Sequence, residues 1–145
     1  MTKILVIPHR AIGDLIFQLP LIKSLSENSN LIIIAPLTNK ADLLLENYKN
    51  IKIKFFDFTD KKILSKIKFF FKLKKFINSF NADEVYCLSA VSWILLPIIF
   101  SKPKKKLLCN IFESKFKRKI YNSTKPSQIT LDFINKNKIK KNNFE

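Results

Sequence analysis

The sequence predicts an α/β fold, a Rossmann-like parallel sheet of about five strands with helices on both faces. Short apolar runs alternate along the chain with longer stretches of helical periodicity. Parallel neighbours require a crossover connection, and crossover helices cover the sheet. The chain has 145 residues, 47% of them hydrophobic, which is enough for the core of one domain. These proportions exclude a disordered chain.

The first half of the chain is expected to hold three strands. A buried strand over residues 3–7 precedes a helix whose apolar residues recur at steps of three and four. Pro20 should either kink this helix or start a new turn. Residues 31–35 form the second strand and residues 39–48 a helix. Residues 51–56 alternate apolar side chains with lysine, which suits an edge strand with one face in water.

Residues 61–80 are predicted to form a long helix. On a helical wheel its lysines gather on one side. The lysines are Lys61, Lys68, Lys72 and Lys75, and the opposite side holds Ile63, Ile67, Phe70, Leu73, Ile77 and Phe80. We interpret it as a crossover helix on the sheet with its lysines in water. The alternative is a basic, aromatic helix lying on a membrane.

The remaining elements complete the alternation. Residues 83–89 read as the fourth strand, followed by a buried helix over 91–100, a fifth strand over 107–111 and a last helix over 129–137. The apolar stretch at 85–100 is too short and too interrupted to cross a bilayer. We expect one domain over residues 1–137 and a basic, frayed tail over 138–145.

The edge character of the third strand predicts the strand order 3-2-1-4-5. In such sheets ligands bind beyond the carboxyl ends of the strands, at the point where the order reverses. This point lies between the first and fourth strands, so residues 8–14 and 89–92 should border one crevice.

Positive charge is concentrated in the second part of the chain. Residues 1–60 carry seven basic and six acidic side chains, whereas residues 61–145 carry twenty and five. Such asymmetry suggests a polyanionic partner, either an anionic membrane or a nucleic acid. All but two of the basic residues are lysines, which argues against nucleic acid because base and phosphate recognition relies on arginine. Compositional drift with solvated lysines is the other explanation.

Gly13 and Asp14 are the most informative residues for chemistry. Gly13 is the sole glycine and lies in the first strand-to-helix turn, where a missing Cβ permits positive φ or the close approach of a ligand. Asp14 follows at the helix start, where a carboxylate can cap backbone N–H groups and gain from the helix dipole. A plain helix cap and an ionised functional carboxylate are both consistent with this position.

The stretch KILVIPHRAIGDLIFQLPLIKSL, residues 3–25, resembles the amino-terminal signature of glycosyltransferase family 9, the ADP-heptose:lipopolysaccharide heptosyltransferases. In that family an apolar strand leads to a loop ending in Gly-Asp, and a helix with a Leu-Pro or Thr-Pro pair follows. Here these positions are Gly13-Asp14 and Leu19-Pro20. A weaker likeness extends to residues 127–139, which resemble the Leu-rich helix closing the family's first domain.

Three positions depart from the family's usual residues. The family usually has Arg and Gly where this chain has Pro8 and Arg10, and Thr is common where it has Gln18. The loop before the helix is therefore expected to be stiffer and bulkier than in the family.

The resemblance implies the first half of a two-domain GT-B fold, with the acceptor on this domain and the nucleotide sugar on the second. The reaction would be an inverting, metal-independent displacement in which Asp14 takes the proton from the acceptor hydroxyl. Residues expected to bind the acceptor, lipopolysaccharide inner core, are Gly13, Arg10, His9, Ser89, Lys115 and Arg118. The donor, ADP-heptose or a similar nucleotide sugar, would be bound by the second domain, which this sequence lacks.

We therefore expect the chain to be inactive alone, cytoplasmic, and able to contact the anionic inner membrane peripherally or to pair with a separate second domain. No cofactor, metal or nucleic acid is expected, and Cys87 and Cys109 are interpreted as reduced core thiols. His9 could assist Asp14 or be a bystander. The alternative functions are a cationic membrane- or polyanion-binding module without catalysis, and a degenerate fragment.

Overall fold

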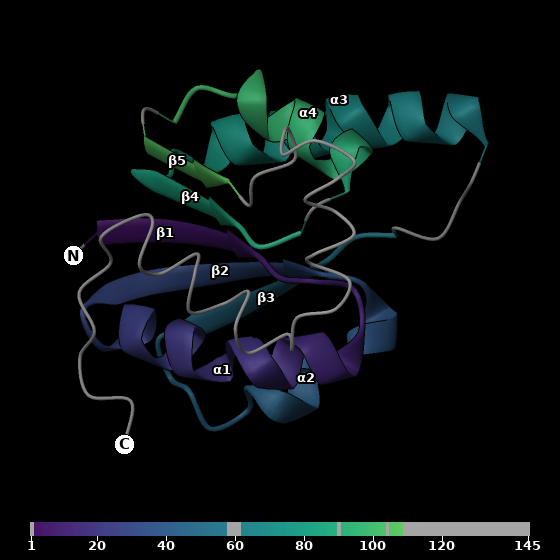
Figure 1. Ribbon diagram of the computed structural model, residues 1–145. Coiled ribbons are helices and arrows are strands. Elements are labelled where there is room, and N and C mark those ends of the chain that lie inside the picture. The colour runs from purple at the N-terminus through teal and green to yellow at the C-terminus, as the bar shows by residue number, and fades with distance from the viewer. Residues whose placement is uncertain (1, 58–61, 90, 104, 109–145) are drawn as a thin grey trace, which may run out of the picture.

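A computed structural model describes residues 2–57, 62–89, 91–103 and 105–108 (Figure 1). The elements, in chain order, are β1 (Thr2–Ile7), α1 (Ile12–Glu27), β2 (Ser29–Ala35), a 3₁₀ turn (Leu37–Asn39), α2 (Ala41–Leu44), β3 (Ile51–Phe55), α3 (Ile63–Phe80), β4 (Glu84–Cys87), α4 (Ser92–Ile99) and β5 (Lys105–Leu108).

The five strands form one parallel sheet in the order β3-β2-β1-β4-β5, which confirms the predicted fold class and strand order. β1 lies at the centre, pairing Leu5 with Ile32 of β2 and with Val85 of β4. β3 is an edge strand whose residues alternate between exposed and half-buried, as its Ile-Lys alternation predicts.

Each face of the sheet carries its own apolar core, because successive side chains of a strand point to opposite faces. On one face Ile4 and Val6 pack with Leu15 and Ile22 of α1. On the other face Leu5 and Ile7 pack with apolar residues of α3 and α4, including Leu73, Ile77, Ile94 and Leu95. Figure 1 shows α1 and α2 on one side of the sheet and α3 and α4 on the other.

Helix α1 runs from Ile12 to Glu27 without a break, so Pro20 does not start a new turn. Proline has no N–H, so the hydrogen bond that would reach back to the carbonyl of Ile16 is missing. Ile16 and Pro20 are both exposed, so water can reach the carbonyl left without this bond. Beyond Pro20, Leu21, Ile22 and Leu25 anchor the helix in the core.

The helix predicted over residues 39–48 is shorter than expected. Asn39 accepts a hydrogen bond from the Ala41 N–H through its side chain at 3.1 Å, and Lys40 adopts a left-handed conformation with φ 53°. These two residues interrupt the helical path, since left-handed backbone cannot continue a right-handed helix. After Leu44 the chain turns, with the Tyr48 N–H donating to the carbonyl of Leu45.

Helix α3 confirms the predicted crossover helix, but its apolar face is only partly as expected. Leu73 and Ile77 are buried, and Phe70 and Phe80 are half-buried. Ile63 and Ile67 are exposed, so the prediction that the apolar side of the helix packs on the sheet was wrong for these two residues. The reason is the length of the helix, whose first turns extend beyond the sheet on the side where the strands end (Figure 1).

Several expectations fall outside the described residues. These are residues 109–111 of the predicted fifth strand, the helix over 129–137, the tail over 138–145, and Cys109. The strand itself, β5, begins at Lys105, two residues before the predicted start. Cys87 is fully buried in β4, as expected for a core thiol. Within the described part of the chain, no helix has both the length and the hydropathy to span a membrane.

Candidate functional site

Helix α1 supports the loop after β1, residues 8–11, through a hydrogen bond to its backbone. The backbone N–H of His9 donates a hydrogen bond to Gln18 Oε1 at 3.1 Å. Gln18 lies on α1 with only 7% of its surface exposed, so its amide is packed under the loop. On the other flank, β4 follows β1 to its end, since the Leu88 N–H donates to the carbonyl of Ile7. The loop therefore lies at the carboxyl end of β1, next to β4, where a ligand is expected.

His9 and Asp14 meet across this loop. Nδ1 of His9 lies 2.6 Å from Oδ2 of Asp14, and the side chains are 40% and 27% exposed. The carboxylate is therefore partly exposed and lies against an imidazole. Sequence reasoning named both residues but did not predict their pairing, because nothing in their spacing shows which way a loop histidine turns.

Asp14 does not cap α1, which corrects one of the two interpretations of its position. The capping residue is Ala11, which offers no side-chain hydrogen bond, and the first helical turn instead begins with Ile12. Asp14 is the third residue of the helix, where the dipole still favours a negative charge. Because the side chain has no capping role, its contact with His9 and its exposure are what distinguish it.

Gly13 is helical and needs no positive φ, contrary to one expectation. A Cβ built on it would meet none of the described residues within 4 Å, so no neighbouring backbone in this part of the chain approaches it either. The fold itself therefore gives no reason for the chain's sole glycine at this exposed position. The other expectation from the sequence, the close approach of a ligand at Gly13, stays a prediction.

The other candidate acceptor residues are scattered. Arg10 is exposed on the same loop and forms no ion pair with any residue that the structure describes. Ser89 is fully buried, and its Oγ accepts a hydrogen bond from the Val91 N–H at 3.4 Å, so it shapes the turn into α4 from beneath the surface. Lys115 and Arg118 lie outside the described residues.

Gln18 is the residue that sequence reasoning missed as part of the site. It appeared only as a departure from the family's usual Thr, with no role attached. A buried amide on a helix, one turn beyond Asp14, is the kind of group that must find a hydrogen-bond partner. That partner is the loop carrying His9.

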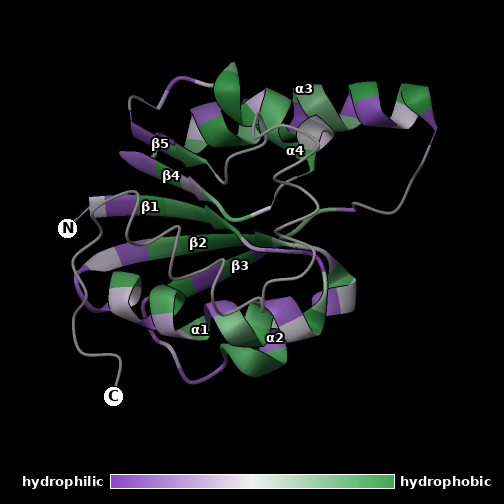
Figure 2. Cartoon of the chain, in the orientation of Figure 1, coloured by the Kyte–Doolittle hydropathy of each residue, from purple (hydrophilic) through white to green (hydrophobic). Residues whose placement is uncertain are grey.

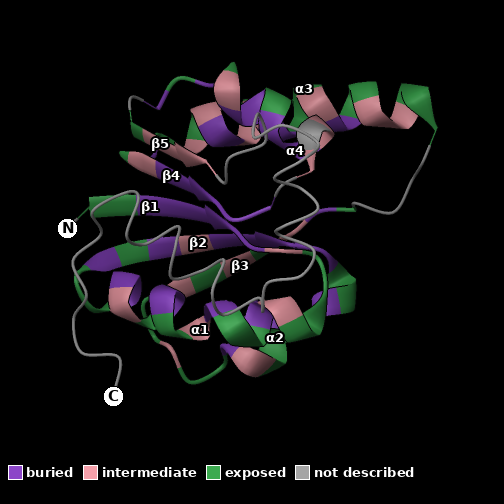
Figure 3. Cartoon of the chain, in the orientation of Figure 1, coloured by how far each residue is buried: buried purple, intermediate pink, exposed green. Residues whose placement is uncertain are grey.

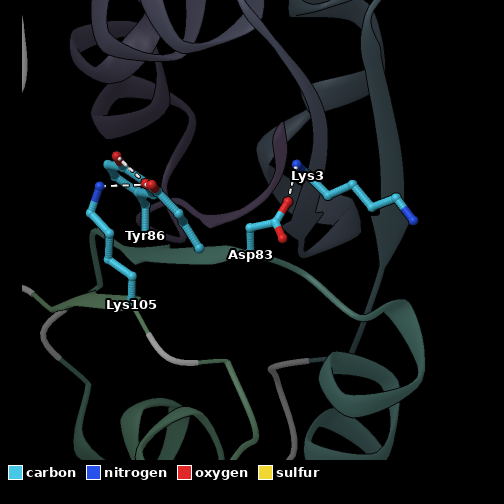
Figure 4. A network of polar contacts seen from close by, with 5 residues as sticks. Lys3, Asp83, Tyr86 and Lys105 are labelled. Atoms are coloured by element: carbon cyan, nitrogen blue, oxygen red, sulfur yellow. Dashed lines mark hydrogen bonds and ion pairs between the residues drawn. The ribbon is translucent and has the colours of Figure 1, made fainter. Parts of the chain in front are cut away.

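A pocket of about 340 Å³ lies at the opposite end of the sheet, near the amino end of β4. Asn78, Asp83 and Lys102 are among its lining residues. Asn78 Oδ1 already accepts the Lys102 N–H at 2.7 Å, and Asp83 Oδ2 accepts the Lys3 N–H at 2.8 Å (Figure 4). Because these polar groups serve the fold, and the pocket contains none of the predicted site residues, we assign it no ligand.

Nearby, Glu84 joins two neighbouring strands. Its carboxylate accepts a hydrogen bond from the Tyr86 hydroxyl at 2.8 Å and pairs with Lys105 Nζ at 2.7 Å. Burial, followed by the hydrogen bond and the negative charge of Glu84, raises the pKa of Tyr86 well above 10.0. This cluster stabilises the seam between β4 and β5 and lies apart from the crevice.

Among the described residues, no group of three or more His, Cys, Asp or Glu side chains could hold a metal ion. Comparison with protein-family models, with curated proteins and with solved structures finds no match for this chain. The chemical assignment of the crevice therefore depends on its own residues and on the sequence resemblance of residues 3–25.

Proposed function

We propose that this chain is the acceptor-binding domain of a glycosyltransferase of the heptosyltransferase kind, the first half of a GT-B fold. The observation that supports it is an accessible carboxylate, Asp14, at the strand-order reversal of a parallel sheet and paired with His9 at 2.6 Å. An inverting sugar transfer requires such a group, a base within hydrogen-bond reach of the attacking hydroxyl.

Asp14 takes the proton from an acceptor sugar hydroxyl in this proposal. The oxygen of that hydroxyl attacks the anomeric carbon of the nucleotide sugar, and the nucleotide diphosphate leaves. In this proposal the imidazole of His9 limits the orientations of the carboxylate by close contact, since its Nδ1 lies 2.6 Å from Asp14 Oδ2 but makes no hydrogen bond among the described residues. His9 is thus a positioning residue, and Gln18 positions it in turn through the loop backbone.

Gly13 provides room for the sugar. The open space where its Cβ would stand adjoins the following residue, Asp14. A methyl group there would project into the volume that the acceptor ring occupies. The fold tolerates that methyl group, so a substitution at Gly13 separates ligand binding from folding.

Arg10 supplies positive charge for binding the anionic acceptor. Inner-core lipopolysaccharide carries phosphates and carboxylates, and a guanidinium forms paired hydrogen bonds with either group. The donor, ADP-heptose or a similar nucleotide sugar, belongs on a second domain that acts with this one. In this proposal the domain works on the cytoplasmic face of the inner membrane, where the acceptor is assembled.

Binding of the acceptor by this chain is the direct test. Deacylated inner-core oligosaccharide is titrated into the full chain and followed by calorimetry. We expect binding that weakens at least tenfold in Asp14→Asn and Gly13→Ala, and that is unchanged in Asp42→Asn, a matched change on the exposed first turn of α2. Equal affinity of all four proteins, or no binding by the wild type, contradicts the proposal.

Transfer is tested by adding the nucleotide-sugar domain of a heptosyltransferase as a separate polypeptide. Loss of a general base lowers rates by about 10²–10⁴, so Asp14→Asn should lose the activity almost entirely. His9→Asn keeps a polar side chain beside the carboxylate and should retain more of the rate than His9→Ala. Transfer at the wild-type rate in Asp14→Asn would rule out the assigned base.

A further inference from the structure

The first turns of α3 present apolar side chains to solvent. Ile63 is 76% exposed, Leu64 73%, Ile67 48% and Phe71 64%. Ile63, Ile67 and Phe71 are spaced by four residues and so share one side of the helix. Figure 2 shows hydrophobic residues alternating with hydrophilic ones at this end of α3, and Figure 3 shows that many of them are exposed. A crossover helix has no structural need for this stripe.

Helix α4 extends the apolar surface. Leu96 is 47% exposed and Phe100, four residues later, is 61% exposed. The ring centroids of Phe70 and Phe100 lie 6.3 Å apart, and those of Phe70 and Phe71 5.3 Å apart. These ring contacts join the two helices into one surface, which we call the α3–α4 face. It consists of Ile63, Leu64, Ile67, Phe70, Phe71, Leu96 and Phe100.

Lysines border the α3–α4 face. Lys68 and Lys75 are exposed and lie next to Leu64 and Phe71 around the helix, and Lys74 Nζ lies 5.9 Å from the Phe70 ring centre. From residue 62 to residue 82 the sequence has six lysines and no acidic residue. An exposed apolar patch with a rim of one charge sign marks an interaction surface, and the rim selects a partner of negative charge.

The charge of the chain argues against two candidates to cover the α3–α4 face, its own residues 109–145 and a second copy of the chain. Residues 109–145 carry nine basic and three acidic side chains, so this segment repels the lysine border rather than complementing it. A second copy placed face to face would bring the two lysine borders together. Like charges placed opposite one another disfavour such a contact.

The partner could be an anionic lipid surface or a nucleic acid, and the apolar centre of the α3–α4 face favours lipid. Nucleic-acid interfaces are polar and rely on arginine for base and phosphate contacts. Interfacial helices instead combine Phe, Leu and Ile on one side with lysine on the other, and the apolar side enters the acyl boundary. The described part of α3 and α4 contains lysine but no arginine.

We propose that the α3–α4 face docks on an anionic lipid surface, with its apolar side chains inserted between headgroups and its lysines held against lipid phosphates. The overhang of α3 lies on the side of the sheet where the strands end (Figure 1). The overhang of α3 and the loop that carries His9 therefore lie at the same end of the sheet. The lipid contact itself does not depend on the proposed sugar transfer.

Vesicle sedimentation with the full chain tests this proposal. Vesicles of phosphatidylcholine with one third phosphatidylglycerol are compared with phosphatidylcholine alone, at low and at high salt. We expect binding to the anionic vesicles only, and weaker binding at high salt because the lysine attraction is screened. Two lysines near the surface contribute about fivefold each, so Lys68→Glu with Lys75→Glu should reduce binding at least twentyfivefold.

Matched changes on the other side of the molecule serve as controls. Ile63→Ser with Phe71→Ser should abolish most of the binding, whereas Leu37→Ser with Leu43→Ser, equally exposed apolar residues near α2, should not. Lys23→Glu with Lys52→Glu reproduces the charge change at exposed positions on α1 and β3. All the substituted residues are exposed, and circular dichroism confirms that each variant folds.

Four outcomes would overturn the proposal. Equal binding to neutral vesicles removes the role of the lysines. Equal losses in the α3 variants and in the controls remove the role of this face. Tight binding to an oligonucleotide that Phe71→Ser does not weaken, without binding to vesicles, indicates a nucleic-acid surface. A dimer by sedimentation velocity that Phe71→Ser dissociates, again without vesicle binding, indicates self-association.

Discussion

Replacing Gln18 with methionine is expected to loosen the loop that carries His9. The change keeps a side chain of similar length in a site that is 7% exposed, and it removes the oxygen that accepts the His9 N–H at 3.1 Å. Leaving a buried donor without a partner costs about 1–3 kcal/mol, and the His9 N–H, which is only part-buried, belongs at the lower end of this range. Burying a thioether rather than an amide offsets about 0.5–2 kcal/mol of that loss. The expected net loss is about 1 kcal/mol of unfolding free energy.

Urea denaturation and amide exchange measure this loss. A destabilisation of about 1 kcal/mol lowers the melting temperature of a domain of this size by about 3–5 °C, and the urea slope m should not change. Exchange at the His9 amide should accelerate about fivefold, the equivalent of 1 kcal/mol. Lys23→Met, an exposed change on the same helix, should stay within about 0.5 kcal/mol of the wild type. If Gln18→Met matched that control in both measurements, the hydrogen bond would not be what holds the loop.

Three further predictions concern stability. Leu73→Ala removes a fully buried side chain from the core between α3 and the sheet and should cost about 2–5 kcal/mol, while Leu64→Ala at a 73% exposed position should cost almost nothing by urea denaturation. Gly13→Ala should raise stability by about 0.5–1 kcal/mol, because the helix gains a better former with room for its methyl group. A loss of stability there would show that a neighbour does occupy this space. Because the pKa of Tyr86 is raised in the folded state, the stability linked to it is complete below pH 10.0 and declines as pH rises further. Tyr86→Phe should therefore lose stability less steeply than the wild type in that alkaline range, and parallel curves would show that Tyr86 ionises normally.

Local pattern was sufficient to predict the sheet. The continuous apolar runs of β1 and β2 mark strands buried on both faces, and the Ile-Lys alternation of β3 marks an edge. The predicted positions of β4 and β5 come from the common strand order of doubly wound folds, which this sheet follows. The faces of α3 could not be predicted this way. A helical wheel shows which residues share a side, but not how far the sheet beneath extends, and this distance leaves Ile63 and Ile67 in solvent. Lys40 in a left-handed conformation likewise follows from the local turn rather than from periodicity.

The site was predictable in location but not in its contacts. The strand order places residues 8–14 beyond the carboxyl end of β1, and Asp14 is found there in the first turn of α1. The partner of Asp14 depends on the rotamer of His9 and on the path of a short loop, which one buried amide determines. The capping interpretation was wrong for a similar reason, since a shift of three residues along a helix start changes which groups a carboxylate can reach.

Pro20 divides α1 into two parts with different attachments to the rest of the molecule. The later part is fixed by Leu21, Ile22 and Leu25 in the interior, whereas the earlier part carries Gly13 and Asp14 and is anchored mainly by Leu15 and Gln18. The backbone hydrogen bond that would join Pro20 to the carbonyl of Ile16 is missing, so small movements of the earlier part need not be transmitted to the later one. The end of the helix that carries Asp14 can thus change its position while the hydrophobic interior stays undisturbed.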